Sequence, residues 1–338
     1  MKKLCLLPLI LISFISFGQS QFVVQNVTTK VFSNINLALA AANAGDTLYI
    51  PGGNFTVSPV SIDKRLHWIG VGHYPAYTTA TQSSKITTNL EFKGNCDGSS
   101  FEGIHFTGSL QFGSTDNDAL NILIKRCRVE GHIYLRTTSA GFPEINFHIT
   151  ESVVRSVDAM NGTNCLVEKN IITGEFSNFR QSLIRHNVIN VNNYYGRFIH
   201  YTQSCTFENN AFGFHAGLYN TESCIFSHNL FAQALPFDPA NPSFTSINNI
   251  SNVGDANMFT SITGNIYNFS YENDYSLKTG NPGIGAASDG TDIGIYGSPK
   301  PYKAGAVPFY PHITQFGVDP ESTGGILGVK ITVQAQDQ

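Results

Sequence analysis

A short pattern of alternating polar and apolar positions recurs through the middle of the chain. Each copy has a small residue, an apolar residue two positions later, an Asn three positions after that, and an apolar residue two positions further on. The clearest copies are 165–172, 182–189, 205–212 and 224–231, and looser copies precede them. The positions equivalent to the Asn are 104, 127, 152, 170, 187, 210 and 229, at intervals of 17 to 25 residues. A self-similar period near twenty is typical of a solenoid.

The alternation has period two, with branched and aromatic residues at the inward positions, and therefore predicts short β-strands. Helical repeats need longer periods, and leucine-rich repeats need Leu where this chain has Phe, Ile, Val and Cys. A coil of ~20 residues at ~3.3 Å per residue has a perimeter of roughly 65 Å, enough for three strands and three bends. Stacked coils would pair in parallel, so we predict an all-β fold, a β-solenoid.

The recurring Asn is predicted to point inward at a bend between two strands. An inward amide lacks partners unless an identical amide lies above and below it, where it can donate and accept along a ladder. Cys165, Cys205 and Cys224 share a second inward position with Ser182. Since residues 21–338 contain an odd number of Cys, five, we expect buried free thiols and no disulfide framework.

The first twenty residues have the pattern of a secretory signal peptide. Met1-Lys2-Lys3 is charged, residues 4–17 are apolar, and small residues around Gly18 offer a cleavage site. We therefore expect a mature protein that is secreted or held at the cell surface. The apolar stretch is short for a membrane span, and no other run approaches the required length.

The number and sign of the charged residues indicate which classes of binding partner are disfavoured. Asp, Glu, Lys and Arg make up 13% of the chain, and the formal net charge is −4. The sequence has no basic stripe, so nucleic acid and anionic membranes are disfavoured as partners. It also lacks the spacings of zinc sites, phosphate-binding loops, Rossmann turns and serine nucleophile elbows.

Residues 21–71 are predicted to open the solenoid. Ser33 is expected to cap a short helix over 34–42, which ends before Gly45, and strands are expected at 46–50, 55–62 and 66–71. A solenoid must protect the core and the pairing edge at its open end. The helix lies where it can do so.

The segment 41–55, Ala-Ala-Asn-Ala-Gly-Asp-Thr-Leu-Tyr-Ile-Pro-Gly-Gly-Asn-Phe, resembles the opening of the pectin-lyase-like superfamily. Members have an Ala-rich helix, a Gly-Asp-Thr-Ile turn and a Pro-Gly-X-Tyr turn, and Phe55 stands where they have the Tyr. The segment 289–297 is similar to the closing phrase of many exported bacterial β-helix proteins. The resemblance spans roughly residues 31–300.

The resemblance implies a right-handed parallel β-helix over 21–300 with a short N-terminal capping helix. It does not single out an activity, because the superfamily includes lyases, hydrolases, esterases, adhesins and inert surface proteins. Residues 301–338 lack the repeat and are predicted to form an extension that packs on or beyond the helix, with one strand at 328–335.

Related β-helix enzymes place their chemistry on the outward face of one strand row. Counting back from the small inward residue of each coil gives the outward positions of the preceding strand. The candidates for catalysis are Asp158, Glu175, Arg136 and His200. The candidates for sugar contact are Tyr134, Arg197, Tyr201 and Tyr219.

Asp158 and Glu175 are expected to be neighbours on adjacent coils. Two carboxylates so close cannot both stay ionised without a cation. Either the pKa of one rises, which gives an acid/base pair, or Ca²⁺ binds between them. Elimination on a uronic acid needs a cation that neutralises the carboxylate and a base for the C5 proton, and Arg or His can fill these roles. The tyrosines can stack on sugar faces.

These residues also have a purely structural explanation, because an exposed strand row carries polar residues and Tyr in any case. A groove for an anionic polymer is usually rich in Lys and Arg, and this face offers mainly Arg136 and Arg197. We therefore expect an exported protein that binds polysaccharide or provides a rigid rod. The alternative is a polysaccharide lyase or glycoside hydrolase acting on an acidic polysaccharide.

Overall fold

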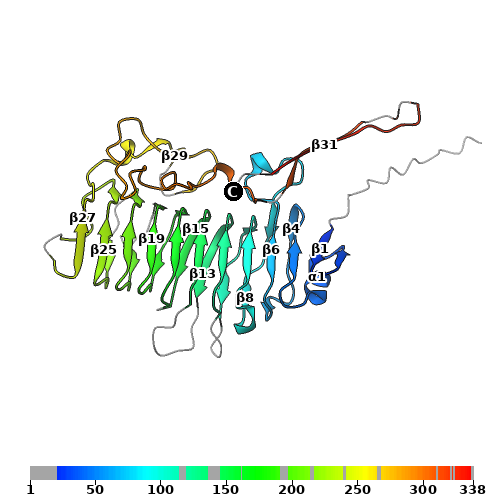
Figure 1. Cartoon of the computed structure of the whole chain (residues 1–338), viewed down its shortest axis with the longest axis horizontal. Coiled ribbons are helices and arrows are strands. Elements are labelled where there is room, and N and C mark those ends of the chain that lie inside the picture. Colours follow the sequence, from blue (N-terminus) through cyan, green and yellow to red (C-terminus); the bar gives the residue numbers. More distant parts are fainter. Residues whose placement is uncertain are drawn as a thin grey trace, which may run out of the picture.

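The computed structural model describes residues 21–113, 119–135, 145–160, 162–190, 197–213, 217–238, 241–264, 268–309, 311–319, 322 and 324–335. These residues form a parallel β-solenoid, as predicted (Figure 1). The predicted signal peptide, residues 1–20, lies outside the described residues.

Equivalent strands of successive coils pair in parallel and form three strand rows along the solenoid. The first row consists of β3 (Thr47–Tyr49), β6 (His67–Ile69), β9 (Ser100–Glu102), β12 (Leu123–Lys125), β14 (His148–Thr150), β16 (Leu166–Glu168), β19 (Leu183–Arg185), β22 (Thr206–Glu208), β25 (Cys224–Ser227) and β27 (Phe244–Ile247). The second row consists of β4 (Gly53–Phe55), β7 (Ser84–Ile86), β10 (His105–Phe106), β17 (Ile171–Ile172), β20 (Val188–Ile189), β23 (Ala211–Phe212) and β26 (Leu230–Phe231). The third row consists of β5 (Ser61–Ile62), β8 (Leu90–Phe92), β11 (Leu110–Phe112), β18 (Phe176–Ser177), β21 (Arg197–His200) and β24 (Gly217–Tyr219). Two long strands, β13 (Arg128–Leu135) and β15 (Val153–Asp158), continue across a bend and belong to both the second and third rows.

The predicted Asn ladder is present at the bend between the first and second rows. Four amides bond in series, with Nδ2 to Oδ1 distances of 3.1 Å from Asn170 to Asn187, 2.9 Å from Asn187 to Asn210 and 3.0 Å from Asn210 to Asn229. Each of these side chains is 0% exposed. Asn229 bonds in turn to Asn249, which extends the ladder one coil beyond the predicted set.

The same column continues upstream without Asn. The backbone N–H of Ser152 donates to Oδ1 of Asn170, and that of Cys127 donates to the Ser152 hydroxyl. Parallel pairing of β9, β12, β14 and β16 brings positions 104, 127, 152 and 170 into register. The predicted single column is confirmed.

Each ladder bend turns through one residue with left-handed backbone geometry. The residues before the four central Asn have φ between 51° and 57°: Lys169, His186, Asn209 and His228. Non-glycine residues adopt this region at some cost in free energy, so the packing around the bend must hold them there. Asn and His are the more common non-glycine residues in this region, so Asn209, His186 and His228 fit it, whereas Lys169 does not.

The interior is filled by aligned apolar residues from all three rows. Phe207 stacks on Phe226 with ring centroids 4.8 Å apart, and Phe212 stacks on Phe231 at 4.6 Å. The cysteines predicted to be free and buried are so: Cys96, Cys127, Cys165, Cys205 and Cys224. Burial raises the pKa of the Cys127 and Cys165 thiols to about 12.

The N-terminal end is covered as expected, with a different cap residue. Helix α1 (Ile35–Ala41) begins after Asn34, whose Oδ1 accepts from the backbone N–H of Asn36, so the predicted cap at Ser33 was wrong by one position. Two strands, β1 (Phe22–Gln25) and β2 (Thr29–Phe32), pair antiparallel along the edge of β3. They occupy the edge on which another coil would otherwise pair.

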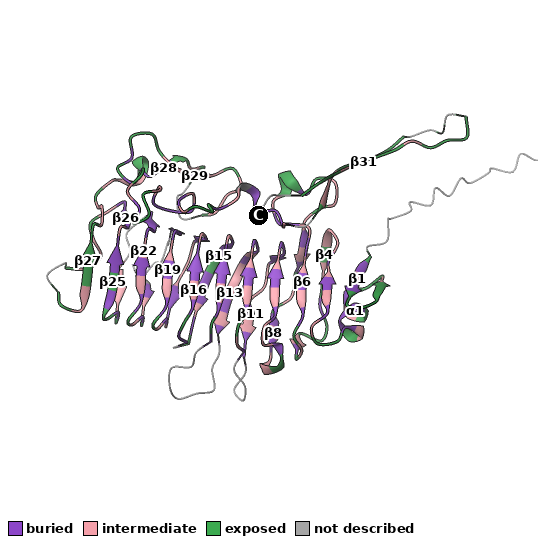
Figure 2. Ribbon diagram, viewed as in Figure 1, coloured by how far each residue is buried: buried purple, intermediate pink, exposed green. Residues whose placement is uncertain are grey.

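The stacked coils end near residue 250, where Leu230 bridges Ile250, and do not continue to residue 300 as expected. Residues 255–309, the return segment, run back along the outside of the second row (Figures 1 and 2). The segment contains the antiparallel strands β28 (Phe259–Ser261) and β29 (Asp274–Leu277). Short 3₁₀ helices are η1 (Pro75–Tyr77), η2 (Gly94–Cys96), η3 (Asp255–Asn257) and η4 (Ala304–Ala306).

The return segment builds a second apolar core on the outer face of the solenoid. Buried residues of the second row face buried residues of the segment, and the two sets are Val153, Ile171, Val188, Ala211 and Leu230, and Met258, Phe259, Tyr275, Ile293, Ile295 and Tyr302. Buried polar bonds anchor it as well. Nη1 of Arg126 donates to the Val307 carbonyl at 3.0 Å, and Nε of Arg126 lies 2.7 Å from Glu151.

The final strands, β30 (His312–Val318) and β31 (Val329–Gln334), form an antiparallel ribbon that extends away from the solenoid (Figure 1). The strand predicted at 328–335 is β31. Paired residues Phe316 and Ile331 are 55% and 52% exposed, which shows that one apolar face of the ribbon is uncovered in this chain.

Within the described ranges no helix is long and apolar enough to cross a membrane.

Replacing a ladder Asn should destabilise the solenoid strongly. Asn187→Ala removes the acceptor of the Asn170 backbone N–H and the donor to the Val167 carbonyl, and leaves both groups buried. An orphaned buried group costs about 1–3 kcal/mol, so we expect a loss of about 2–5 kcal/mol in the free energy of unfolding, measured by urea denaturation. The control Asn95→Ala, at an exposed position, should change it by less than about 0.5 kcal/mol. Equal shifts in the two variants would contradict the ladder's role.

The buried thiols should be unreactive in the folded protein, because thiolate is the nucleophile and burial disfavours it. At pH 8 we expect the five cysteines of the described residues to react with Ellman's reagent only after guanidinium is added. Rapid release of thionitrobenzoate from the native protein would show that at least one thiol is accessible.

Candidate functional site

The predicted site residues occupy the outward face of the third row. The register aligns Tyr134 of β13 with Asp158 of β15, Ser177 of β18, His200 of β21 and Tyr219 of β24. The residues just before them form the inward column, Ile133, Val157, Phe176, Ile199 and Leu218. The five outward side chains therefore stand on adjacent parallel strands in one line, the outer row.

The predicted pairing of Asp158 with Glu175 was wrong in register. Asp158 lies opposite Ser177 of β18, and Glu175 lies two positions before Ser177, just ahead of the strand. The cause is the turn after β15: Asp158 precedes Cys165 by seven residues, whereas Ser177 precedes Ser182 by five. A shift of two residues keeps a side chain on the same face but changes its neighbours.

The Asp158 side chain instead forms hydrogen bonds within and beside the turn that follows β15, the turn whose length sets the register. Its Oδ1 accepts from the Asn178 side-chain amide at 2.8 Å and from the Met160 backbone N–H at 3.0 Å. Glu175 comes close to a different predicted residue, since its Oε2 lies 3.7 Å from Nε2 of His200. The Glu175 side chain is 46% exposed and that of His200 is 19% exposed, so solvent reaches both.

Aromatic side chains flank the outer row at both ends. His132 stacks on Tyr134 with ring centroids 5.4 Å apart and planes 7° apart. At the other end Tyr201 and Tyr219 meet edge to face at 5.5 Å, and His200 lies 5.7 Å from Tyr201. Such ring surfaces can pack on the apolar faces of sugars.

Two predicted residues cannot be placed in this site. Arg136 lies outside the described residues, and the side chain of Arg197 on β21 is likewise not described. Among the described residues, no group of three or more His, Cys, Asp or Glu side chains is arranged to hold a metal ion. Binding of Ca²⁺ by Asp158 and Glu175 stays a prediction.

Counting along the repeat missed three members of the outward face. Beyond the Tyr134 end of the outer row, the same column of outward positions holds Gln111 and Glu91, whose side chains bond at 3.2 Å, and His132 lies beside Tyr134 on β13. The signal was present as period-two alternation in 90–92 and 110–112, but those coils lack the Asn that marks the register.

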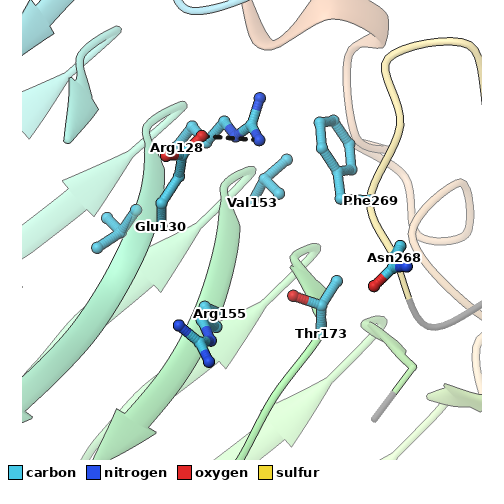
Figure 3. A pocket seen from close by; sticks show the side chains of 8 residues that line it. Arg128, Glu130, Val153, Arg155, Thr173, Asn268 and Phe269 are labelled. Carbon is cyan, nitrogen blue, oxygen red and sulfur yellow. Dashed lines mark ion pairs between the residues drawn. The ribbon is translucent and has the colours of Figure 1, made fainter. Parts of the chain in front are cut away.

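A concave feature lies where β13 and β15 face the return segment. It is a cavity of about 460 Å³ (Figure 3) lined by Arg128, Val129, Glu130, Val153, Arg155, Thr173, Asn268 and Phe269. We call it the junction pocket. Its strands are those that carry Tyr134 and Asp158, further along the chain.

Three side chains on one side of the junction pocket contact one another. Nη2 of Arg128 lies 2.9 Å from Glu130, and Nε2 of His105 lies 3.0 Å from the same carboxylate oxygen. The Arg128 guanidinium also lies over the rings of Phe269 and Tyr271, at 5.2 and 4.9 Å from their centroids. Burial and the nearby Arg128 charge lower the pKa of His105 to about 4, so this imidazole is neutral at physiological pH.

No family model matches this chain. A comparison with curated proteins finds the F-box protein SKIP5 of Arabidopsis thaliana, 40% identical over 67 residues. The match covers 20% of this chain and 24% of that protein, so the chain spans about a quarter of the relative's length. A likeness over so short a segment assigns no family and no activity.

Proposed function

We propose that this protein is an exported right-handed β-helix protein of the pectin-lyase-like type. In this proposal it binds polysaccharide along the outer row, at the cell surface or outside the cell. The observation that carries the proposal is the alignment of Tyr134, Asp158, Ser177, His200 and Tyr219 on five adjacent strands.

The chemistry of the outer row suits a linear glycan. Aromatic surfaces at the two ends, His132/Tyr134 and Tyr201/Tyr219, offer stacking sites for sugar rings. Between them, the Asp158 carboxylate and the His200 imidazole can bond to sugar hydroxyls, whereas Ser177 is only 4% exposed. The parallel strands repeat at ~4.8 Å, so an extended chain lying along the solenoid meets equivalent positions in succession.

The rigid strands that carry the outer-row side chains also favour binding. The side chains of the outer row project from strands whose inward neighbours, such as Ile133, Val157 and Phe176, are fully buried. Sites on regular strands keep their geometry, so little conformational entropy is lost when a ligand binds.

Truncation of one aromatic platform should weaken binding. Tyr219→Ala removes a ring of the Tyr201/Tyr219 pair, and we expect about tenfold weaker binding to the glycan selected by the unmodified protein on a polysaccharide array. The matched control is Tyr49→Ala, a partly exposed Tyr on the first row. Glycan binding that survives Tyr219→Ala unchanged, or fails equally in both variants, would contradict binding at the outer row.

The second candidate is a polysaccharide lyase or glycoside hydrolase, and the Glu175–His200 contact at 3.7 Å favours it. A carboxylate beside an imidazole on an exposed face can orient that imidazole as a base, here for the C5 proton of a uronic acid. The assay is release of unsaturated uronide from pectate, alginate and glycosaminoglycans, followed by absorbance with and without Ca²⁺. For a lyase we expect release that falls at least about a hundredfold in His200→Ala. No release from any polymer would exclude lyase activity on those polymers.

A further inference from the structure

We propose that the junction pocket binds a sugar ring bearing one oxyanion, a carboxylate or a sulfate ester. The inference rests on the proposed function, because it assigns a charged substituent to the glycan that the outer row would hold. Its basis is a separate group of residues, at the junction between the solenoid and the return segment.

The charge balance of the pocket leaves one cation uncompensated. Glu130 lies within 3.0 Å of both Arg128 and His105, so its carboxylate is engaged on that side of the pocket. Arg155, on the neighbouring strand, is exposed and has no carboxylate within ion-pair distance in the described part of the chain. With Arg128 and Glu130 offsetting each other, the Arg155 guanidinium gives the pocket a net positive charge.

The position of Arg155 in the strand register explains why its guanidinium has no carboxylate partner within the residues that the structure describes. Arg155 follows Val154, and Glu130 follows Val129, with which Val154 is paired. The register shifts between Val129 and His132, so β13 has an extra residue here and Arg155 has no regular partner on that strand. Here Glu130 is drawn toward Arg128, which is itself held over Phe269 and Tyr271 of the return segment. The register shift and the Arg128–Glu130 contact together leave the Arg155 guanidinium without a carboxylate partner among the described residues.

The remaining lining fits a sugar ring. Figure 3 shows Phe269 facing Arg128 across the upper part of the pocket, with Arg155 at the lower left, Thr173 at the lower centre and Asn268 below Phe269. The Phe269 ring and Val153 supply apolar surface, and the Thr173 hydroxyl and Asn268 amide supply neutral donors and acceptors. A guanidinium binds carboxylate and sulfate through two parallel N–H groups, which favours Arg155 as the oxyanion contact.

The pocket and the outer row belong to the same two strands. β13 runs from Arg128 in the pocket to Tyr134 in the row, and β15 runs from Val153 to Asp158. A glycan lying on the outer row can thus place a charged substituent or branch into the pocket.

The test is an NMR titration of the full chain with methyl glucuronide, glucose 6-sulfate and uncharged methyl glucoside. We expect the charged sugars to bind and the glucoside to bind at least about tenfold more weakly, with binding of the charged sugars weakened by added salt. A preference between the two charged probes identifies the oxyanion as carboxylate or sulfate.

Arg155→Gln should weaken binding of the charged sugars at least about tenfold and leave the response to methyl glucoside unchanged. Arg155→Lys should recover only part of the affinity, because an ammonium lacks the planar fork of donors. The control is Arg65→Gln, which removes the same charge at an exposed position between β5 and β6. Equal binding of charged and uncharged sugars, an equal loss in the control, or no binding of either charged sugar would overturn the inference.

Different experimental results would refute the proposed function and the pocket assignment. If Tyr219→Ala abolishes polysaccharide binding while Arg155→Gln leaves every titration unchanged, the pocket assignment falls and the proposed function stands. If sugar binding in the titrations depends on Arg155 while Tyr219→Ala leaves polysaccharide binding unchanged, the proposed function is wrong and the pocket is an independent oxyanion site.

Discussion

The structure depends on the hydrogen-bonded stack of side-chain amides at one bend of each coil. Each Asn accepts from the backbone and the amide of the coil before it, and donates to the coil after it. Because a buried amide without partners is costly, a coil that slips by one residue loses these bonds and turns its apolar face outward. The ladder thereby fixes the parallel register, and the register decides which side chains meet on every outer face.

The sequence was sufficient to predict the features that repeat. The Asn column, the buried cysteines and the all-β solenoid follow from spacing alone, since identical positions in successive coils must stack. The Asp158–Glu175 pairing failed for a local reason. Turns between strands vary in length without disturbing the core, and the turn after Asp158 is two residues longer than those of the next coils. Alternation preserves the face through such an insertion, but the identity of the neighbour depends on turn length.

The junction pocket could not be predicted, because Asn268 and Phe269 lie more than a hundred residues from the strands that they face. One signal was available for the return segment itself. The residue directly after each ladder Asn points away from the interior yet is apolar, as with Ile171, Val188 and Leu230. Consecutive apolar residues in a strand indicate burial on both faces, which requires a covering layer. The sequence predicts that such a layer exists without showing which segment forms it.

The return segment also imposes an order on the maturation of the native state. Coils can be added one after another, because each contacts only its immediate neighbours. The segment has no such local partner: the Arg126–Val307 bond joins residues 181 positions apart, and the apolar strip under the segment is contributed by at least five coils. That strip does not exist until those coils have stacked. Docking of residues 255–309 is therefore a late, long-range closure step, and until it occurs the nascent solenoid exposes a continuous hydrophobic stripe to other chains.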